Sequence, residues 1–475
     1  MRHSMIATRR LTRHVLAPTL DILRRTHATH SFHELEKTQW WPRERIEQLQ
    51  SERLQHLIHY AYAHVPYYRQ MMDERGIRPD TINTSSDLCM LPVLTKADVR
   101  AHFRDLLAQG FPHKELLLGQ TGGSTGTPLT FYSSRQARWS HGIGRSLRAL
   151  TWAGIYPGDP TVMVAKRHRP GPVRTVPFSR IVAWLTRETL EDCTYFSDAT
   201  LPEIVQRLAR RRPRALRGYA SAMCIIADFI RESDMPAPEV AAIVVGGEQL
   251  FDEQRALLRE VFGLEPFSKY SSFENYDIAM ECGSHSGMHV AAEDLIVETV
   301  DDEGNPVPPG NEGRLLVTNL HEYGMPLIRY DTDDKGAFAT GPCECGRSLP
   351  RLRAVEGKTG NTIYTPSGRR MSPLALGCSS LAGLRIRQFQ FVQEQLDQVI
   401  VKIVPETALD QHSCESVSKS IETHYRSVLG EEMRVDVVMV NRIEPTPAGK
   451  HLFLLSNVKR PQCRGLPEGT DLHAD

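Results

Sequence analysis

The sequence predicts an α/β fold in which a large N-terminal domain precedes a small α+β C-terminal domain. Up to about residue 265, short apolar runs alternate with stretches of helical periodicity, which indicates a sheet flanked by helices. After residue 290 the strands follow one another directly, as in antiparallel sheets, and this predicts mixed sheets with a small barrel-like subdomain. From about residue 357 a β-β-α-β order indicates a separate module.

Helices are predicted where apolar residues recur three and four positions apart. The stretch 36–75 shows this spacing and is broken at Val65-Pro66, because a residue that precedes proline disfavours the helical region. Thr95 is placed to cap a helix that begins at Lys96. The further expected helices span residues 87–107, 135–152, 200–212, 220–233, 252–263 and 412–429.

Strands are predicted from short runs rich in β-branched residues. The continuous apolar run 241–245 is typical of a strand buried on both faces, and the polar turn 302–306 separates two strands of a hairpin. The expected strands span residues 161–165, 240–246, 295–300, 314–318, 388–393, 398–404 and 434–440.

These patterns divide the chain into four parts. We expect a basic helical segment over 1–34, a large domain over 35–356, a small domain over 357–460 and a polar tail over 461–475. The first 30 residues hold six arginines, four histidines and one acid, Asp21, which fits either a transit peptide or a basic amphipathic helix. We favour a helix that packs on the body through Leu11, Val15, Leu16, Leu20 and Leu23.

Composition excludes several classes of function. The 57 Lys and Arg residues balance 57 Asp and Glu residues, so no basic excess points to nucleic acid as a partner. No run approaches the roughly 20 apolar residues that a membrane span requires. The nine cysteines are mostly scattered over a chain of 475 residues, which indicates a reducing compartment, and we expect a cytoplasmic protein.

A polar, glycine-rich turn spans Thr121–Pro128. Glycines that free successive N–H groups, together with Ser and Thr hydroxyls, form a concave donor surface suited to phosphate oxygens. The turn is not a Walker A loop, because no Gly-Lys-Ser/Thr ends it. An ordinary surface loop remains the alternative.

Paired cysteines and histidines indicate a second site. Soft ligands at these spacings could close a tetrahedral structural Zn²⁺ site, whereas the alternative is a set of unrelated core thiols and surface histidines. The spacing does not decide which histidine would bind. The candidate ligands are Cys282, His285, His289, Cys343 and Cys345.

Five motifs in order resemble those of the adenylate-forming ligases, specifically the phenylacetate–CoA ligase-like branch with its capsular-polysaccharide homologues. The resemblance covers roughly residues 35–455, and the similar cysteines of that branch favour zinc. The motifs are Thr121–Pro128, Gly246-Gly247-Glu248, Tyr270-Ser271-Ser272-Phe273-Glu274, Tyr330-Asp331-Thr332-Asp333-Asp334 and Thr446-Pro447-Ala448-Gly449-Lys450.

This resemblance implies an AMP-forming acid–thiol ligase that uses ATP, Mg²⁺ and CoA, with residues 35–356 as the AMP-binding domain and residues 357–460 as a mobile domain. Lys450 would be the catalytic lysine, Glu274 would bind Mg²⁺ and Asp334 would bind the ribose. The substrate would be an aryl or acyl carboxylic acid. The residues implied at the nucleotide and the hinge are Thr121, Gly122, Gly123, Ser124, Thr125, Gly126, Gly247, Glu248, Tyr270, Ser271, Asp334 and Lys358.

Three positions depart from the family pattern. Asp333 stands where glycine is usual, Thr127 where lysine is frequent, and the hinge at Gly357-Lys358 lacks the usual arginine and paired acids. Because the hinge serves the second half-reaction, transfer to an amine or a carrier protein instead of CoA stays open, as does a catalytically degenerate homologue. A homodimer is also left open.

Overall fold

The computed structural model describes residues 2–120, 129–165, 187–192, 200–356, 363–366, 370–371, 386–405, 411–441, 443 and 454–458. The chain divides into two compact units, a larger one over Met1–Gly123 and Pro128–Gly357 and a smaller one that includes Lys358–Asp475. The predicted boundaries at residues 34 and 460 stay predictions.

The larger unit is built on one mixed sheet. Among the described residues, eleven strands pair in the order β10-β11-β12-β13-β9-β8-β7-β6-β5-β3-β4. Strands β3 to β7 run parallel to their neighbours, whereas β7 to β13 are joined by antiparallel pairs. This arrangement confirms the α/β class and joins the antiparallel part to the parallel strands. The strands are β3 (Thr161–Ala165), β4 (Glu188–Asp192), β5 (Ala215–Gly218), β6 (Ala242–Gly246), β7 (Phe267–Ser272), β8 (Tyr276–Glu281), β9 (Met288–Val290), β10 (Leu295–Val300), β11 (Gly313–Asn319), β12 (Tyr330–Phe338) and β13 (Arg351–Glu356).

Helices bury both faces of the parallel strands. On β6, Ile243 and Val245 pack in a core with α9 (Leu201–Arg211), α10 (Ala220–Ser233) and α11 (Asp252–Phe262). The alternate residues, Ala242 and Val244, pack in a second core with α7 (Ile143–Trp152). Successive side chains of a strand point to opposite faces, so the continuous apolar run 241–245 follows from burial on both sides.

The predicted helix break in the N-terminal part is confirmed. Helix α4 (Arg43–His64) ends at an extended Val65, and α5 (Pro66–Arg75) follows. Thr95 caps α6 (Lys96–Ala101) in a capping box with Asp98, although that helix is shorter than the predicted stretch 87–107. A short 3₁₀ helix, η3 (Ser85–Met90), takes up part of the remainder. A separate pair, β1 (Leu116–Gln120) and β2 (Thr130–Ser134), flanks residues 121–128.

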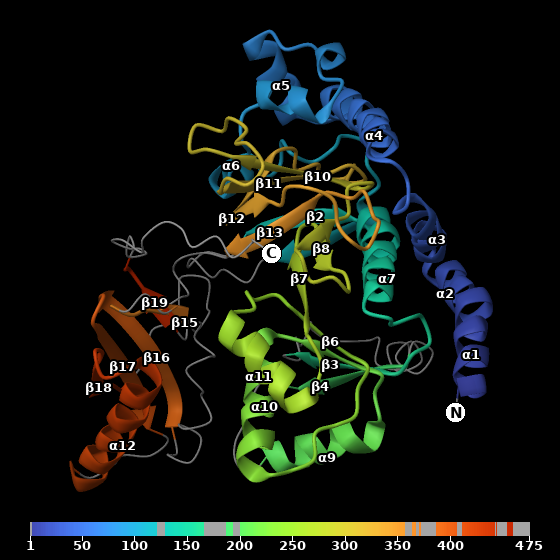
Figure 1. Ribbon diagram of the computed structural model, residues 1–475. Coiled ribbons are helices and arrows are strands. Elements are labelled where there is room, and N and C mark those ends of the chain that lie inside the picture. The colour runs from blue at the N-terminus through green and yellow to red at the C-terminus, as the bar shows by residue number, and fades with distance from the viewer. Residues whose placement is uncertain are drawn as a thin grey trace, which may run out of the picture. The chain divides into compact units, whose positions relative to one another are not determined.

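The N-terminal segment is helical, but the predicted packing face is wrong in part. Helices α1 (Arg2–Leu11), η1 (Thr12–Leu16) and α2 (Ala17–Arg24) follow one another without a gap, and after a turn at Arg25, α3 (Ala28–Thr38) lies beside α7 (Figure 1). Leu20 is buried and Leu16 half-buried, whereas Leu11, Val15 and Leu23 are exposed. Within the described residues, no helix combines the length and hydrophobicity that crossing a membrane would need.

The smaller unit is an α+β module. Its sheet has the order β18-β17-β16-β19 among the described residues. Helix α12 (Gln411–Leu429) contributes Ile421 and Tyr425 to a core with Phe391 and Val401 of the sheet. The strands are β16 (Ile386–Gln395), β17 (Gln398–Pro405), β18 (Arg434–Met439) and β19 (Leu454–Ser456), with a short pair β14 (Ile363–Tyr364) and β15 (Arg370–Met371).

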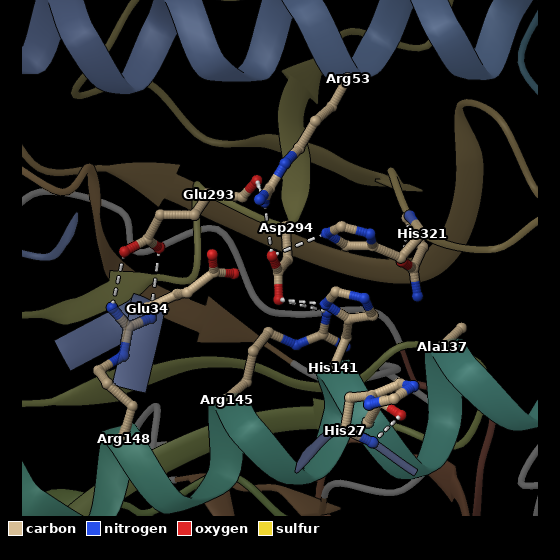
Figure 2. A network of polar contacts seen from close by, with 12 residues as sticks. His27, Glu34, Arg53, Ala137, His141, Arg145, Arg148, Glu293, Asp294 and His321 are labelled. Atoms are coloured by element: carbon tan, nitrogen blue, oxygen red, sulfur yellow. Dashed lines mark hydrogen bonds and ion pairs between the residues drawn. The ribbon is translucent and has the colours of Figure 1, made fainter. Parts of the chain in front are cut away.

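Two adjacent buried carboxylates join the layers of the larger unit (Figure 2). Asp294 accepts from Arg53 of α4 at 2.8 Å and lies 2.9 Å from His321, while Arg145 of α7 lies 3.5 Å away. Glu293 accepts from Arg148 of α7 at 2.9 Å and from Thr38 of α3 at the same distance. A charge that is buried must be paired, so these contacts hold α3, α4 and α7 against the turn before β10.

The imidazoles beside Asp294 do not form a good cation site. His141 and His321 stack with ring centroids 3.4 Å apart and an interplanar angle of 10°. The lone pairs of two parallel rings cannot converge on one ion, and two guanidinium groups already face the carboxylate. Burial lowers the pKa of His321 to about 4, although the negative charge of Asp294 acts in the opposite direction and raises this pKa. Burial alone would raise the pKa of Asp294, but the two histidines hold it well below its usual value.

We expect Asp294→Asn to destabilise the larger unit strongly. The substitution leaves the buried Arg145 and the half-buried Arg53 without their carboxylate, and breaking a buried pair typically costs about 3–5 kcal/mol. The measurement is the urea midpoint followed by tryptophan fluorescence. The control is Asp80→Asn, which removes an exposed ion pair with His59 and should change stability by less than about 0.5 kcal/mol. Equal midpoints for the two variants would contradict this role of Asp294.

Candidate functional site

The parallel strands end together at one edge of the sheet. Residue pairs along β5, β6 and β7 run in parallel register, for instance Val244 with Phe267 and Gly246 with Lys269. Tyr219 follows β5 directly, and Gly247 follows β6 directly. Because open α/β sheets bind ligands at the carboxyl ends of their strands, this edge is the candidate site.

Gly247 occupies a position at this edge that only glycine fits well. Its φ is +76°, and a Cβ atom there would lie 3.0 Å from the ring of Tyr219. The backbone of residue 247 therefore passes close over the aromatic face, and its peptide is open to solvent. Glu248 follows and is half-buried.

Two tyrosines connect the motif at 270–274 with the motif at 330–334. The Tyr270 hydroxyl donates to Asp334 Oδ2 at 2.8 Å, and the Tyr330 hydroxyl donates to Glu274 Oε1 at 2.6 Å. Three strands separate β7 from β12 in the sheet order, so the antiparallel part must curl to bring these side chains together. This curvature agrees with the predicted barrel-like subdomain.

The tyrosine hydroxyls stay protonated and can only act as donors to these acids. Burial, and then the neighbouring carboxylate, raise the pKa of Tyr270 and of Tyr330 well above the ordinary value. Each hydroxyl therefore holds one oxygen of a carboxyl group in a defined position. Glu274 and Asp334 are thus two oriented acids, half-buried or buried, in one place.

The backbone explains the unusual residue beside Asp334. Asp333 has a φ of +61°, in the left-handed region where glycine is the ordinary choice and Asp is tolerated better than most residues. Its Oδ2 accepts from Lys96 Nζ at 2.8 Å, and the same ammonium donates to the Thr332 carbonyl at 3.0 Å. This lysine, the first residue of α6, therefore holds the turn that presents Asp334.

Strand β2 is anchored by a buried acid that the sequence motifs did not reveal. Glu322 accepts from the Ser134 N–H at 2.8 Å and from the Ser133 hydroxyl at 3.0 Å. Burial raises the pKa of Glu322 although these donors oppose the shift. Since Gln120 pairs with Thr130 across β1 and β2, both ends of the segment 121–128 are held together.

Several predicted site residues cannot be placed. The glycine-rich turn, the hinge lysine and the C-terminal lysine lie outside the described residues. They are Thr121, Gly122, Gly123, Ser124, Thr125, Gly126, Lys358 and Lys450. Ser271 lies on β7 beside Tyr270 and is half-buried.

Three cysteines and one histidine converge where two hairpin turns meet. Cys282 follows β8, His289 lies in β9, and Cys343 and Cys345 lie between β12 and β13. Their four ligand atoms all lie within 4.8 Å of one another. The Sγ atoms of Cys282 and Cys343 are 3.6 Å apart, and His289 Nε2 is 3.2 Å from Cys345 Sγ.

His289 rather than His285 faces the thiols. Its Nδ1 lies 3.1 Å from the Leu349 carbonyl, an arrangement that directs the proton to Nδ1 and leaves Nε2 free to bind a metal. His285 instead lies 3.2 Å from Glu281 and packs against Phe267. The geometry therefore excludes His285 from the four-ligand group and resolves the choice that the spacing left open.

The donor set fits Zn²⁺. Two thiolates bound tetrahedrally at about 2.3 Å lie roughly 3.8 Å apart, close to the separation of the Cys282 and Cys343 sulfurs. Burial opposes ionisation of Cys343, but the Ser284 hydroxyl and the Cys345 N–H lower its pKa to about 6. A Cys₃His set is a known type of structural zinc site.

Comparison with known proteins finds similarity to coenzyme A ligases and to the protein CapK. The family model described as the CapK C-terminal domain matches residues 364–457. A phenylacetate–coenzyme A ligase of Thermus thermophilus is 28% identical over 331 residues, covering 68% of this chain and 72% of that protein. Protein CapK of Staphylococcus aureus is 22% identical over 429 residues, covering 87% of this chain and 89% of that protein.

The fold also matches solved structures. A 2-hydroxyisobutyryl-CoA ligase in the postadenylation state, in complex with R3-HIB-AMP, superposes with a TM-score of 0.62 at 20% identity. The match covers 89% of this chain and 92% of that one. This likeness confirms the predicted fold class, with its large N-terminal domain and its C-terminal domain.

We propose that Cys282, His289, Cys343 and Cys345 hold one structural Zn²⁺. The protein purified without chelators should contain about one zinc per chain by elemental analysis. His289→Asn and Cys345→Ser should each lower the bound zinc several-fold. His285→Asn is the matched control, because asparagine tolerates the left-handed φ of +48° at that position, and it should retain the metal. A zinc-free wild-type protein, or equal loss in His285→Asn, would refute the assignment.

Proposed function

Because the chain belongs to the adenylate-forming ligase superfamily, we propose that it uses ATP to activate a carboxylic acid and then transfers the acyl group to the thiol of CoA. The substrate carboxylate attacks the α-phosphorus, the bond to the bridging oxygen breaks, and pyrophosphate leaves. The thiol sulfur then attacks the carbonyl of the acyl-adenylate, its proton is lost, and AMP leaves. The names of the similar phenylacetate–coenzyme A ligases and of the 2-hydroxyisobutyryl-CoA ligase support the proposal that an acid is joined to CoA.

The reciprocal tyrosine–carboxylate contacts are the observation that carries the proposal. They support one role for Glu274 and another for Asp334, because each acid is held in place by a different tyrosine. We assign to Asp334 the hydrogen bonds from the ribose hydroxyls. Glu274 would bind Mg²⁺, which neutralises phosphate charge as the two anions approach.

The remaining nucleotide contacts are proposed from the strand ends and from the sequence motifs. We assign the adenine to the segment Gly247-Glu248 beside Tyr219, where the backbone comes close to an aromatic ring. The turn 121–128 would hold the β- and γ-phosphates through main-chain N–H groups and hydroxyls. Lys450 would neutralise the substrate carboxylate and the α-phosphate in the first half-reaction, and Lys358 would belong to the hinge.

The acid is proposed to be aryl or acyl, and aromatic side chains such as Phe131 and Tyr219 are candidates to line its pocket. Phe131 is fully buried in the core and packs against Gly119, where a Cβ would lie 2.5 Å from its ring. Tyr219, at the carboxyl end of β5, stays a candidate.

A different acceptor is the second candidate. The departures at Gly357-Lys358 favour transfer to an amine or a carrier-protein thiol, since the hinge serves the second half-reaction. Acid-dependent pyrophosphate exchange without CoA thioester formation would select this alternative. The predicted cytoplasmic location stays a prediction.

We expect acid-dependent ATP–pyrophosphate exchange over a panel of aryl and acyl acids, and Lys450→Ala should reduce it at least about 100-fold. Lys402→Ala, on β17 of the same unit, removes an equivalent charge and should leave exchange unchanged. Exchange absent with every acid would reject the proposed activity. Exchange unaffected by Lys450→Ala would reject only the role of the lysine.

Glu274→Gln should raise the Mg²⁺ concentration needed for half-maximal exchange by about tenfold or more. The amide oxygen can still accept from Tyr330, so the fold is preserved while the negative charge on the metal ligand is lost. Glu303→Gln, in the exposed turn after β10, is the control. A Mg²⁺ dependence like that of the wild-type protein would remove Glu274 from the metal site.

A further inference from the structure

The N-terminal arm, residues 2–25, presents an apolar outward face. Leu11 is 51% exposed, Val15 50%, Ile22 78% and Leu23 63%. Val15 and Ile22, seven positions apart, lie on one side of the helices and Leu23 lies beside that side, while Leu11 also lines a pocket with Val162 of β3. Side chains of this size are seldom left exposed together in a folded protein unless they meet a further surface.

The polar side of the arm is the side that faces the body, so the orientation is fixed. Arg9 makes two hydrogen bonds of 2.7 Å to the buried Asp159, and Arg13 lies 2.6 Å from Glu36. Thr12 is buried against Gly158, where a Cβ would lie 2.5 Å from the threonine hydroxyl. These contacts turn the apolar residues outward and prevent the arm from rolling to bury them.

Basic residues flank the apolar face. Arg10, His14 and Arg25 are exposed, and the arm contains six arginines against one acid. That acid, Asp21, is directed inward, where it accepts from the N–H groups of Ala28 and Thr29 at the start of α3. The exposed Arg10 and Arg25 therefore place positive charge beside the apolar residues, whereas Arg9 and Arg13 are paired on the inner side.

We propose that this face lies flat on an anionic membrane surface. Helices that bind at the lipid headgroups combine a row of large apolar side chains with flanking arginines, and they do not span the bilayer. A second copy of the chain fits less well, because a two-fold interface would place Arg10 and Arg25 of one copy against the same basic face of the other. The arm thereby anchors the larger unit at a lipid surface without entering its candidate site.

Co-sedimentation with vesicles tests the proposal on the full-length protein. The wild-type chain should bind vesicles that contain phosphatidylglycerol and remain in solution with phosphatidylcholine alone, and added salt should weaken binding. The Ile22→Glu/Leu23→Glu variant should bind at least about tenfold more weakly. Met90→Glu/Val438→Glu is the matched control, because it adds two carboxylates at apolar residues that are each 43% exposed elsewhere.

A second variant separates charge from packing. Arg10→Gln/Arg25→Gln keeps the apolar face and should reduce both the binding and its salt dependence. The proposal is overturned if the wild-type chain stays in solution with anionic vesicles, or if the control loses as much binding as the variant at 22 and 23. Sedimentation velocity showing a dimer that Ile22→Glu/Leu23→Glu dissociates would assign the face to a second copy instead.

Discussion

Buried charge at the Glu293–Asp294 turn is the constraint on which the larger unit depends. Three arginines from two helices converge on two carboxylates that are almost inaccessible to water, so none of these side chains can lose its partner cheaply. The contacts at the Glu293–Asp294 turn extend toward the candidate site through His321, which contacts Asp294 and directly precedes Glu322. Glu322 in turn anchors the strand that leaves the segment 121–128. The contacts that hold the helices against the sheet therefore continue, through neighbouring residues, to the candidate site.

Much of the fold could be predicted because local periodicity and burial agree. The run 241–245 had to be a strand with two buried faces, and the break at Val65-Pro66 follows from the geometry of proline. The N-terminal helix shows where periodicity fails. Its apolar spacing identifies one side of the helix but cannot tell whether that side faces inward, since the orientation is decided by ion pairs with Glu36 and the distant Asp159.

The motifs propose Glu274, Asp334 and Tyr270 as site residues but do not show which of them touch. The hydrogen bonds from Tyr270 to Asp334 and from Tyr330 to Glu274 form only because the sheet curls over three strands. In the same way, spacing favoured neither His285 nor His289, and the direction of β9 decided between them. The left-handed Asp333 shows that a departure from a glycine pattern can preserve the backbone conformation that the glycine served.

The partnership between Arg53 and the Asp294 turn also bears on how the chain is synthesised. Arg53 meets acceptors that follow it by 240 and 241 residues. At roughly 5–20 residues per second, the ribosome needs about 12–50 s to supply them. Throughout that interval Leu54, Leu57 and Ile58 of the nascent helix lack most of the strands that later cover them. Helix α4 therefore exposes an apolar face in the nascent chain until the later strands are made.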